Sequence, residues 1–221
     1  MKTPLTILAI VALSLGAMYL FAPEPDPELV KARTDLPWQI TVNPDGSSRV
    51  FDIDLGKANL SDAQIKFGPV ENYAVFVRDQ NNSDLEAYFG NVMFGPLKAK
   101  VVVQLAASEE EKQALAEGSG KRESSPTGDW KYTLSKADQA LQAQRLVTAI
   151  SYVPGTRSLD KDFFLERFGK PAATLQENEE AVSWFYPEKG LSVLIDNDGR
   201  EVLEYVAPRD FVMPEGVTPY P

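Results

Sequence analysis

An uncharged apolar run near the N-terminus constrains this chain more than any other feature. Residues Leu5–Ala22 read LTILAIVALSLGAMYLFA, 18 residues that carry no charge. At 1.5 Å per residue, a helix of this length covers about 27 Å, which is close to the roughly 30 Å hydrocarbon core of a bilayer. The run therefore predicts a transmembrane helix within residues 1–22.

The charges on either side of this run predict its orientation. Lys2 precedes it, and an acidic, proline-rich segment begins at Pro23. Because basic residues stay on the cytoplasmic side, we expect a cytoplasmic N-terminus and a periplasmic C-terminal domain. A cleaved signal peptide is the alternative, but the bulky Tyr-Leu-Phe at 19–21 makes a poor cleavage site. We therefore expect an uncleaved single-pass anchor that crosses a bacterial inner membrane through residues 4–22.

The composition removes most enzyme chemistry. The 221 residues include no cysteine and no histidine, which excludes disulfides, zinc–thiolate centres and imidazole bases. The 22 basic and 32 acidic residues give a formal net charge of −10, so nucleic acid is not expected as a partner. We expect no catalytic residue, no cofactor and no metal centre.

Composition also predicts how the chain is divided. Alternating prolines predict an extended stalk, and the Gly- and Ser-rich stretch that begins at Glu117 predicts a flexible joint. The expected segments are a transmembrane anchor at 1–22, a Pro-rich stalk at 23–37, a first α+β lobe at 38–116, a flexible linker at 117–132, a second α+β lobe at 133–207 and an extended tail at 208–221.

Turn and cap residues mark the boundaries of helices and strands in the first lobe. A turn at Asn43–Gly46 predicts a hairpin, Gly68 ends a short helix, and Ser108 with Glu111 forms a capping box. The expected elements are hairpin strands at 39–42 and 49–54, helices at 60–67 and 108–117, and strands at 72–78, 84–94 and 97–106.

The second lobe is expected to open with a helix. Ser135 is a suitable N-cap, and a loosely amphipathic helical pattern follows at Ala137, Leu141, Leu146, Val147 and Ile150. The remaining expected elements are a helix at 160–168 and strands at 172–176, 181–186, 191–195 and 201–206.

The two halves contain matching motifs. Phe67-Gly68 at one helix end matches Phe168-Gly169 at another, and LEAYF at 85–89 matches AVSWF at 181–185. Each half is therefore expected to contain a helix, a Phe-Gly break and an antiparallel meander. Together these patterns predict an α+β fold: an N-terminal transmembrane helix followed by two small lobes, each with short helices packed on an antiparallel meander sheet.

The stretch Leu159–Val206 resembles the small lipoproteins of the outer-membrane β-barrel assembly machine, the BamE/OmlA type. The same fold occurs in tandem in the β-lactamase inhibitory protein. This resemblance implies helices on one face of an antiparallel sheet and a binding role without catalytic residues. The chain departs from the family in lacking the lipid-bearing cysteine, in whose place it carries the apolar run. The matching motifs are the helix end Arg167-Phe168-Gly169-x-Pro171, the strand Trp184–Pro187, the restart Gly190-Leu191 and the turn Asp196–Gly199.

Aromatic side chains are the candidate partner-binding residues. Strand alternation points about half of them away from a core, where an exposed ring can anchor a partner. The candidates are Trp184 and Tyr186 in one strand, Tyr88 in another, and Trp38 just after the stalk. Packing in the core, or against the first hairpin for Trp38, is the alternative for each.

These observations predict a non-catalytic, membrane-anchored binding or accessory subunit of a bacterial envelope complex, with an envelope protein as its partner. One alternative is an inhibitor or regulator of a periplasmic enzyme, presented through the loop Asp79–Ser83. A second is a carboxylate-dependent glycan hydrolase, which needs paired Asp or Glu residues in a cleft. Asp52 and Asp54 are one such pair. The alternative is that they have no catalytic role and lie on a solvent-exposed strand face.

Overall fold

The computed structural model describes residues 33–79, 82–125, 128–155, 159–197 and 201–221. Residues Thr34–Pro221 form one compact unit. No helix within these described ranges is both long enough and apolar enough to cross a membrane. The predicted transmembrane helix at 1–22 and the stalk up to residue 32 lie outside the described residues, so both stay predictions.

Strands dominate the described residues. The helices are α2 (Leu60–Phe67), α3 (Glu109–Glu117), α4 (Lys136–Ala140) and α5 (Lys161–Phe168), with 3-10 turns η1 (Pro187–Lys189) and η2 (Pro208–Asp210). A small sheet contains β1 (Thr41–Val42), β2 (Ser48–Val50) and β3 (Ile53–Asp54). The large sheet contains β4 (Asn72–Asp79), β5 (Asn82–Phe94), β6 (Leu97–Leu105), β7 (Lys121–Ser124), β8 (Trp130–Thr133), β9 (Val147–Pro154), β10 (Ala173–Gln176), β11 (Ala181–Tyr186), β12 (Leu191–Asp196), β13 (Val202–Val206) and β14 (Thr218–Pro219).

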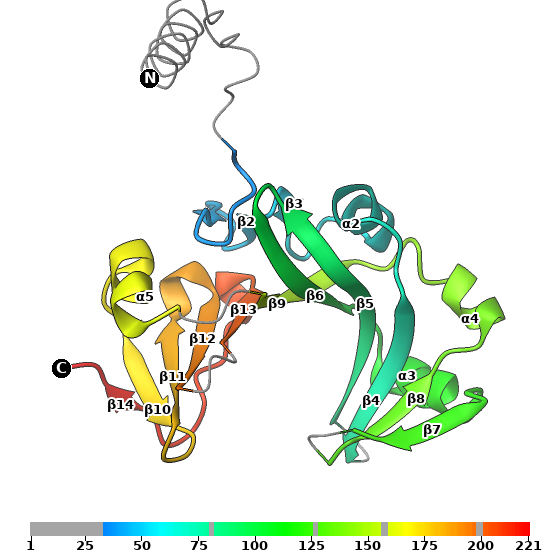
Figure 1. The fold of residues 1–221 in the computed structure, drawn as a ribbon. Coiled ribbons are helices and arrows are strands. Elements are labelled where there is room, and N and C mark those ends of the chain that lie inside the picture. Colours follow the sequence, from blue (N-terminus) through cyan, green and yellow to red (C-terminus); the bar gives the residue numbers. More distant parts are fainter. Residues whose placement is uncertain (1–32, 80–81, 126–127, 156–158, 198–200) are drawn as a thin grey trace, which may run out of the picture. The chain divides into compact units, whose positions relative to one another are not determined.

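The large sheet is antiparallel and has 11 strands in the order β14-β10-β11-β12-β13-β9-β6-β5-β4-β8-β7 (Figure 1). It contains two meanders, β4-β5-β6 from the first half and β10-β11-β12-β13 from the second. Strand β9 lies between them and pairs with β6 on one side and with β13 on the other. A single strand therefore joins the two halves into one sheet.

The expected α+β fold of two small lobes is wrong, because the described residues are mostly antiparallel strand and the halves share one sheet. The apolar pattern after Ser135 predicted a helix to Ile150, whereas α4 ends at Ala140 and β9 begins at Val147. Strand β9 reads VTAISYVP, which is rich in β-branched residues. Because both of its edges pair with other strands, sheet hydrogen bonding outweighs the loose helical spacing.

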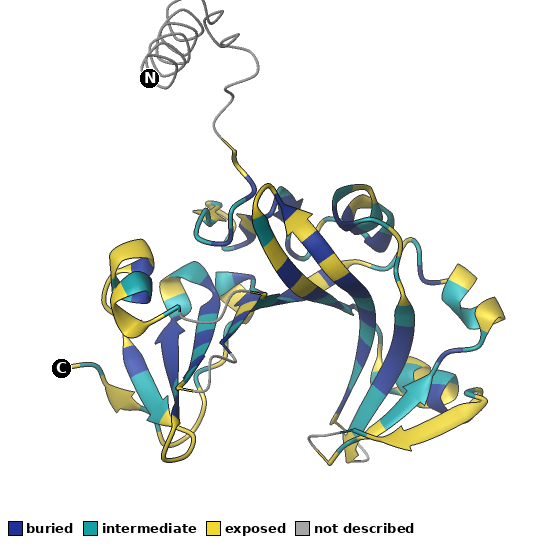
Figure 2. Cartoon of the chain, viewed as in Figure 1, coloured by how far each residue is buried: buried dark blue, intermediate teal, exposed yellow. Residues whose placement is uncertain are grey.

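One hydrophobic core serves both halves, and the inner strands that surround it are buried (Figure 2). The ring of Phe51 lies at its centre and is fully buried. Its centroid lies 4.8 Å from that of Phe94, 5.4 Å from that of Tyr152 and 5.4 Å from that of Tyr205. Since these rings come from β5, β9 and β13, each half covers apolar surface of the other, which two independent lobes could not do.

Phe51 reaches the core from an unfavourable backbone conformation. Phe51 and Asp52 form the two-residue loop between β2 and β3, with φ of 52° and 62°. Positive φ at both loop positions is the type I′ hairpin turn, which favours Asn-Gly and disfavours a bulky residue. The burial of the Phe51 ring against its aromatic neighbours compensates for this local strain.

Within the stretch expected to be a flexible linker, 117–132, β7 and β8 form one edge of the sheet. Strand β7 pairs with β8, and β8 pairs with β4. The guanidinium carbon of Arg122 lies 3.5 Å from the centre of the Trp130 ring, a cation–π contact across the β7–β8 pair. Charged residues and a short strand are how sheet edges avoid pairing with other chains, so the polar composition marks an edge.

The two flanking segments are also folded. The stalk was expected to extend to residue 37, but Asp35 and Pro37 are buried. The tail expected at 208–221 begins with η2 and ends in β14, which pairs with β10. The Tyr220 ring then packs edge-on against Trp184 with centroids 5.6 Å apart. Apolar contacts therefore hold both segments on the sheet, despite their prolines.

Helices α2 and α5 end in the same way, as the repeated motif predicted. Gly68 and Gly169 follow them with φ of 93° and 80°, a region that side-chain-bearing residues avoid. Each glycine N–H donates to the carbonyl four residues earlier, on Gln64 and Leu165. A meander follows each helix in the same strand order, β4-β5-β6 and β10-β11-β12. The local repeat is therefore present within the single sheet.

The sequence match between the two meanders is one residue out of register. The sequence match makes Phe89 equivalent to Phe185. In the structure, Tyr88 is the residue that occupies the position equivalent to Phe185. The Tyr88 carbonyl accepts from the N–H of Glu71 at 2.8 Å, and the Phe185 carbonyl accepts from that of Ala172 at 2.8 Å. Short aromatic strands match in more than one register, and only the ladder distinguishes them.

Each helix-ending phenylalanine packs on an equivalent strand residue. The Phe67 ring contacts Phe89 with centroids 5.4 Å apart, and Phe168 contacts Tyr186 with centroids 5.7 Å apart. These contacts agree with the corrected register. They also place α2 and α5 at corresponding positions in the two repeats.

Candidate functional site

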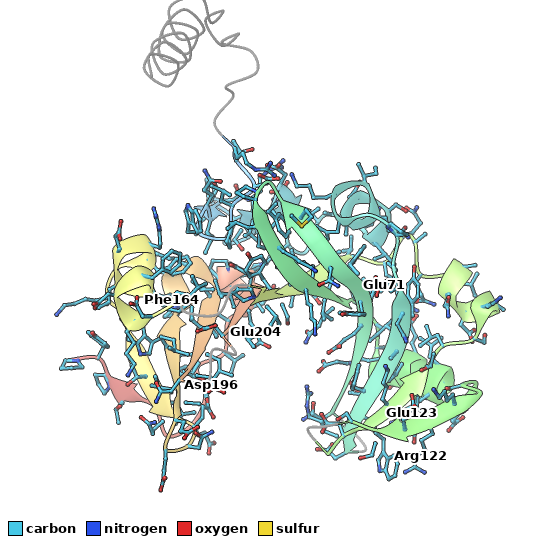
Figure 3. The ribbon with its side chains drawn as sticks, in the orientation of Figure 1. Glu71, Arg122, Glu123, Phe164, Asp196 and Glu204 are labelled. Carbon is cyan, nitrogen blue, oxygen red and sulfur yellow. The ribbon has the colours of Figure 1, made fainter. Side chains whose placement is uncertain are left out.

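Strand alternation gives β10–β13 two different faces. Trp184 and Tyr186 of β11 belong to the core, on the face that α5 covers through Phe164 and Phe168. The intervening Ser183 and Phe185 therefore point to the opposite face. Figure 3 shows the side chains of Glu204 on β13 and Asp196 on β12 projecting from the sheet, with Phe164 beneath α5.

The face opposite α5 carries a groove of about 880 Å³. Half-buried aliphatic side chains of four strands and residues that follow η2 line it. The apolar lining includes Leu175, Leu194, Val202, Val206, Phe211 and Val212. The acidic lining consists of Glu177, Asp196, Glu204 and Asp210. A groove of this volume is large enough for a small ligand or for several side chains of a peptide.

The groove is acidic. Among the described residues that line it there is no lysine or arginine, beside four carboxylates. The Ser183 hydroxyl donates to the Glu177 carboxylate at 2.5 Å. The Nε atom of Arg209 lies 3.6 Å from a carboxylate oxygen of Asp210. The described lining of the groove therefore combines an apolar floor with four carboxylates.

One carboxylate of β5, Glu86, lies on the same face as the groove, where Arg78 and Lys131 also act on it. Glu86 pairs with Gln104 on β6, Gln104 pairs with Ala149 on β9, and Ala149 pairs with Val206 in the groove. Residues that pair across a sheet lie on the same face, so Glu86 shares this face with the groove. Glu204 lies two residues from Val206 and is on this face as well.

Glu86 and Glu204 are two carboxylates of this face whose pKa values are raised. Burial, the negative charge of Asp84 and, more weakly, that of Glu204 raise the pKa of Glu86 to about 7. Desolvation, followed by the charge of Asp84, raises the pKa of Glu204, although this residue is exposed on the surface. Within the described part of the chain neither forms a salt bridge, since Arg78 pairs with Asp84 at 2.6 Å. A cation placed here would therefore be stabilised by both groups.

Two of the four predicted aromatic anchors are not accessible to a partner. Trp184 and Tyr186 are each 4% exposed, and the Tyr186 hydroxyl donates to the Gly169 carbonyl at 3.1 Å. Strand alternation by itself allows either face, and the contacts with α5 and Tyr220 select the core.

The other two aromatic candidates are half-buried. Tyr88 lies on the same face as Glu86, beside the acidic surface. Trp38 packs edge-on against Phe163 with centroids 5.9 Å apart, and the guanidinium carbon of Arg167 lies 4.8 Å from its ring centre. Trp38 therefore joins the chain entry to α5, and of the four aromatic residues only Tyr88 lies near the groove face.

The remaining candidates are occupied by structural contacts. Asp52 accepts from Lys66 at 2.8 Å, and Asp54 pairs with Arg49 at 2.7 Å, so the pair is held in ion pairs. In the loop proposed for an inhibitor, Ser83 is buried and donates to Glu109, while residues 80 and 81 lie outside the described ones. No group of acidic side chains suited to a metal ion occurs among the described residues.

The groove residues were not among the predicted site residues, although the sequence carries a signal for two acidic residues of this face. Glu86 in LEAYF and Glu204 in VLEYV are charged residues in the middle of otherwise apolar strands. Such positions mark the solvent side of a half-buried strand.

Comparisons with protein-family models, with curated proteins and with solved structures gave no match. The resemblance of Leu159–Val206 to the assembly lipoproteins therefore stays a prediction.

Proposed function

We propose that the protein is a non-catalytic binding or accessory subunit of a bacterial envelope complex, and that the groove on β10–β13 is its docking surface. The observation that carries this proposal is the partly apolar, acidic groove on the face of β10–β13 opposite α5. The apolar run at residues 4–22 would tether this surface to the inner membrane, with the folded unit in the periplasm.

The construction of the groove supports docking. Its floor consists of neighbouring strands held by continuous antiparallel ladders, so the side chains that would meet a partner are pre-positioned. Half-buried aliphatic residues such as Leu194 and Val202 offer apolar area that a partner can cover. The resemblance of Leu159–Val206 to a family of binding proteins supports the same proposal.

The aromatic content of the groove favours a protein partner over a glycan. Sugar rings stack on exposed Trp or Tyr faces, whereas the aromatic residues among the described lining are Phe185, which is buried, and Phe211. Aliphatic side chains interspersed with carboxylates match the side chains of a peptide segment better.

The proposal can be tested by crosslinking, because the chain contains no cysteine and one introduced thiol is unique. Leu194→Cys places a thiol in the groove, and Glu166→Cys on the exposed side of α5 is its matched control. Each full-length variant, carrying a photoactivatable crosslinker, is irradiated in cell-envelope membranes. We expect a discrete protein adduct from Leu194→Cys that an excess of cysteine-free protein abolishes, and no such adduct from Glu166→Cys. Equal adducts from both positions, or none from the groove, would contradict the proposal.

A carboxylate-dependent glycan hydrolase is the second candidate, and one observation favours it. Glu86, with a pKa of about 7, is in the range suited to a general acid at neutral pH. If the leading proposal is right, the protein releases no reducing ends from cell-wall glycan. Release that Glu86→Gln abolishes would establish the hydrolase instead.

A further inference from the structure

The charges of the groove face indicate what kind of partner segment it accepts. We propose that the occupant is an extended segment of the partner protein in which lysine or arginine residues alternate with aliphatic residues. This inference rests on the proposed function, since it names the chemistry of the segment that docks. It commits to a protein segment, and a glycan, a lipid surface or a second copy of this chain would each overturn it.

The apolar part of the inference comes from the groove floor. Leu175, Leu194 and Val202 lie on three strands and are half-buried, so each retains surface that an aliphatic side chain can cover. Val212, beside them in the lining, is 83% exposed. An extended segment presents every second side chain to the surface on which it lies, which suits a row of separate apolar contacts.

The cationic part comes from charge complementarity. Four carboxylates and no basic residue occur in the described lining, and Glu86 lies on the same face beyond it, where Arg78 and Lys131 offset its charge in part. Desolvation and the charge of Asp84 disfavour the ionised forms of Glu86 and Glu204, and Arg78 offsets this effect only in part at each group. Ammonium and guanidinium groups form charge-assisted hydrogen bonds with such carboxylates and relieve the repulsion.

The distance between the two carboxylates suits a peptide. Strands β6 and β9 separate β5 from β13, and the ladders place Glu204 level with Tyr88, two residues along β5 from Glu86, so the two positions are about 16 Å apart along the sheet. An extended chain covers this distance in four to five residues, at roughly 3.3 Å per residue. A segment of about ten residues therefore reaches from Glu86 to the acidic groove with at least two cations in contact.

The test uses three fluorescent peptides of about ten residues, in which valine alternates with lysine, with serine or with glutamate. Binding to the full-length protein in detergent is followed by fluorescence anisotropy. We expect the lysine peptide to bind at least about ten-fold more tightly than the other two. Raising the salt concentration from about 0.05 M to about 0.5 M should weaken it several-fold.

Charge-neutralising variants locate the binding. Glu204→Gln and Glu86→Gln should each weaken the lysine peptide about five-fold, whereas Glu166→Gln on α5, which changes the net charge equally, should leave it within two-fold. A circular dichroism spectrum confirms that each variant is folded. If one groove variant does not fold, the other carries the comparison, since they lie on different strands.

The outcomes separate this inference from the proposed function. Equal binding of the three peptides, with the Leu194→Cys adduct intact, overturns the cationic segment and leaves the docking surface standing. Loss of both the adduct and peptide binding overturns both. Lysine-peptide binding that all three Gln variants weaken equally shows attraction to an acidic protein in general, and also overturns the inference.

Discussion

The hydroxyl of Tyr205 donates a hydrogen bond of 2.9 Å to the main-chain carbonyl of Pro37, 168 residues earlier in the chain. Both groups are buried, and burial raises the pKa of the Tyr205 phenol well above its ordinary value, so the hydroxyl stays a donor at any physiological pH. This bond joins the point where the chain enters the folded unit to β13, which borders the groove. The entry segment and the groove face are thus parts of one structure.

Removal of this hydroxyl should destabilise the whole unit. We expect Tyr205→Phe to lower the free energy of unfolding by about 1–2 kcal/mol, because the Pro37 carbonyl would remain buried without its partner. Urea unfolding of the wild type and the variant measures this difference. Tyr88→Phe, at a half-buried position on the groove face, is the control and should change stability by less than about 0.5 kcal/mol. Equal stability of wild type and Tyr205→Phe would show that the bond contributes nothing.

Lys66 holds the entry segment through two carboxylates. Its ammonium lies 2.9 Å from Asp35 and 2.8 Å from Asp52, and all three side chains are largely shielded. We expect Lys66→Met to lower the free energy of unfolding by about 1–3 kcal/mol, between the values for exposed and buried pairs. Lys57→Met, which breaks the exposed pair with Asp45, should have a smaller effect.

The contribution of Lys66 should be confined to a range of pH. The hydrogen bond from Lys66 lowers the pKa of Asp52 from 3.8. The ionised carboxyl therefore adds stability above pH 3.8, and this stability is lost as the pH falls further. Desolvation lowers the pKa of Lys66, but its hydrogen bonds to Asp52 and Asp35 outweigh that effect, so the pKa is raised above 10.5. The contribution of the lysine to stability is therefore complete below pH 10.5 and is lost as the pH rises further. The stability difference between wild type and Lys66→Met should therefore be constant near neutral pH and shrink in acid and in alkali. A difference independent of pH would exclude these ion pairs as its cause.

Glu86 should have the opposite effect on stability. Because burial and Asp84 raise its pKa from 4.5 to about 7, the folded state takes up a proton more readily than the unfolded state. Ionised Glu86 therefore destabilises the fold above pH 7 and not below 4.5. We expect Glu86→Gln to raise the free energy of unfolding by about 1–2 kcal/mol near pH 8, a value reduced for solvent screening, and to leave it unchanged near pH 4.

A pH series of urea unfolding curves checks the prediction for Glu86. Asp84, Arg78, Glu204 and Lys131 all act on this carboxyl, so the variants must leave these four residues unchanged. The exposed Glu166→Gln substitution should show no such dependence on pH. If Glu86→Gln were equally stabilised at both pH values, ionisation of Glu86 would not be the cause.

Elements with local signals were predictable from the sequence. Ser108 is an N-cap and Gly68 and Gly169 end their helices, as expected, and Asn59 and Asp160 cap the other two helices in the same way, each side chain accepting from the third helical N–H. In each case the deciding contact joins residues a few positions apart. The strands of both meanders also lie close to their expected positions, because alternating apolar residues and turn residues mark them directly.

Strand β9 was not predictable in the same way, and the fold class was wrong for that reason. The spacing of Leu146 and Ile150 agrees with a helix as well as their residue types agree with a strand. The choice is made by β6 and β13, whose ladders lie on either side of β9. Those partners are distant in the sequence, so no local pattern of residues contains the information.

The candidate site follows the same division. From the sequence alone, Trp184 and Tyr186 were as eligible for exposure as Phe185, since strand alternation separates two faces without saying which is covered. The packing of α5 and Tyr220 assigned the tryptophan and tyrosine to the core. That assignment turned Glu204 and the aliphatic residues beside it toward the groove.

The sequence by itself determined the short-range features of this protein: the caps and Phe-Gly ends of the helices, the turns, most strands, and a chain without cysteine or histidine. Only the tertiary structure decided that the halves form one sheet, that Phe51 unites their core, and that Glu86 and Glu204 share an acidic face. The physical reason is that caps and turns are bonded within a few residues, whereas strand pairing and burial depend on partners that the chain brings together only when it folds.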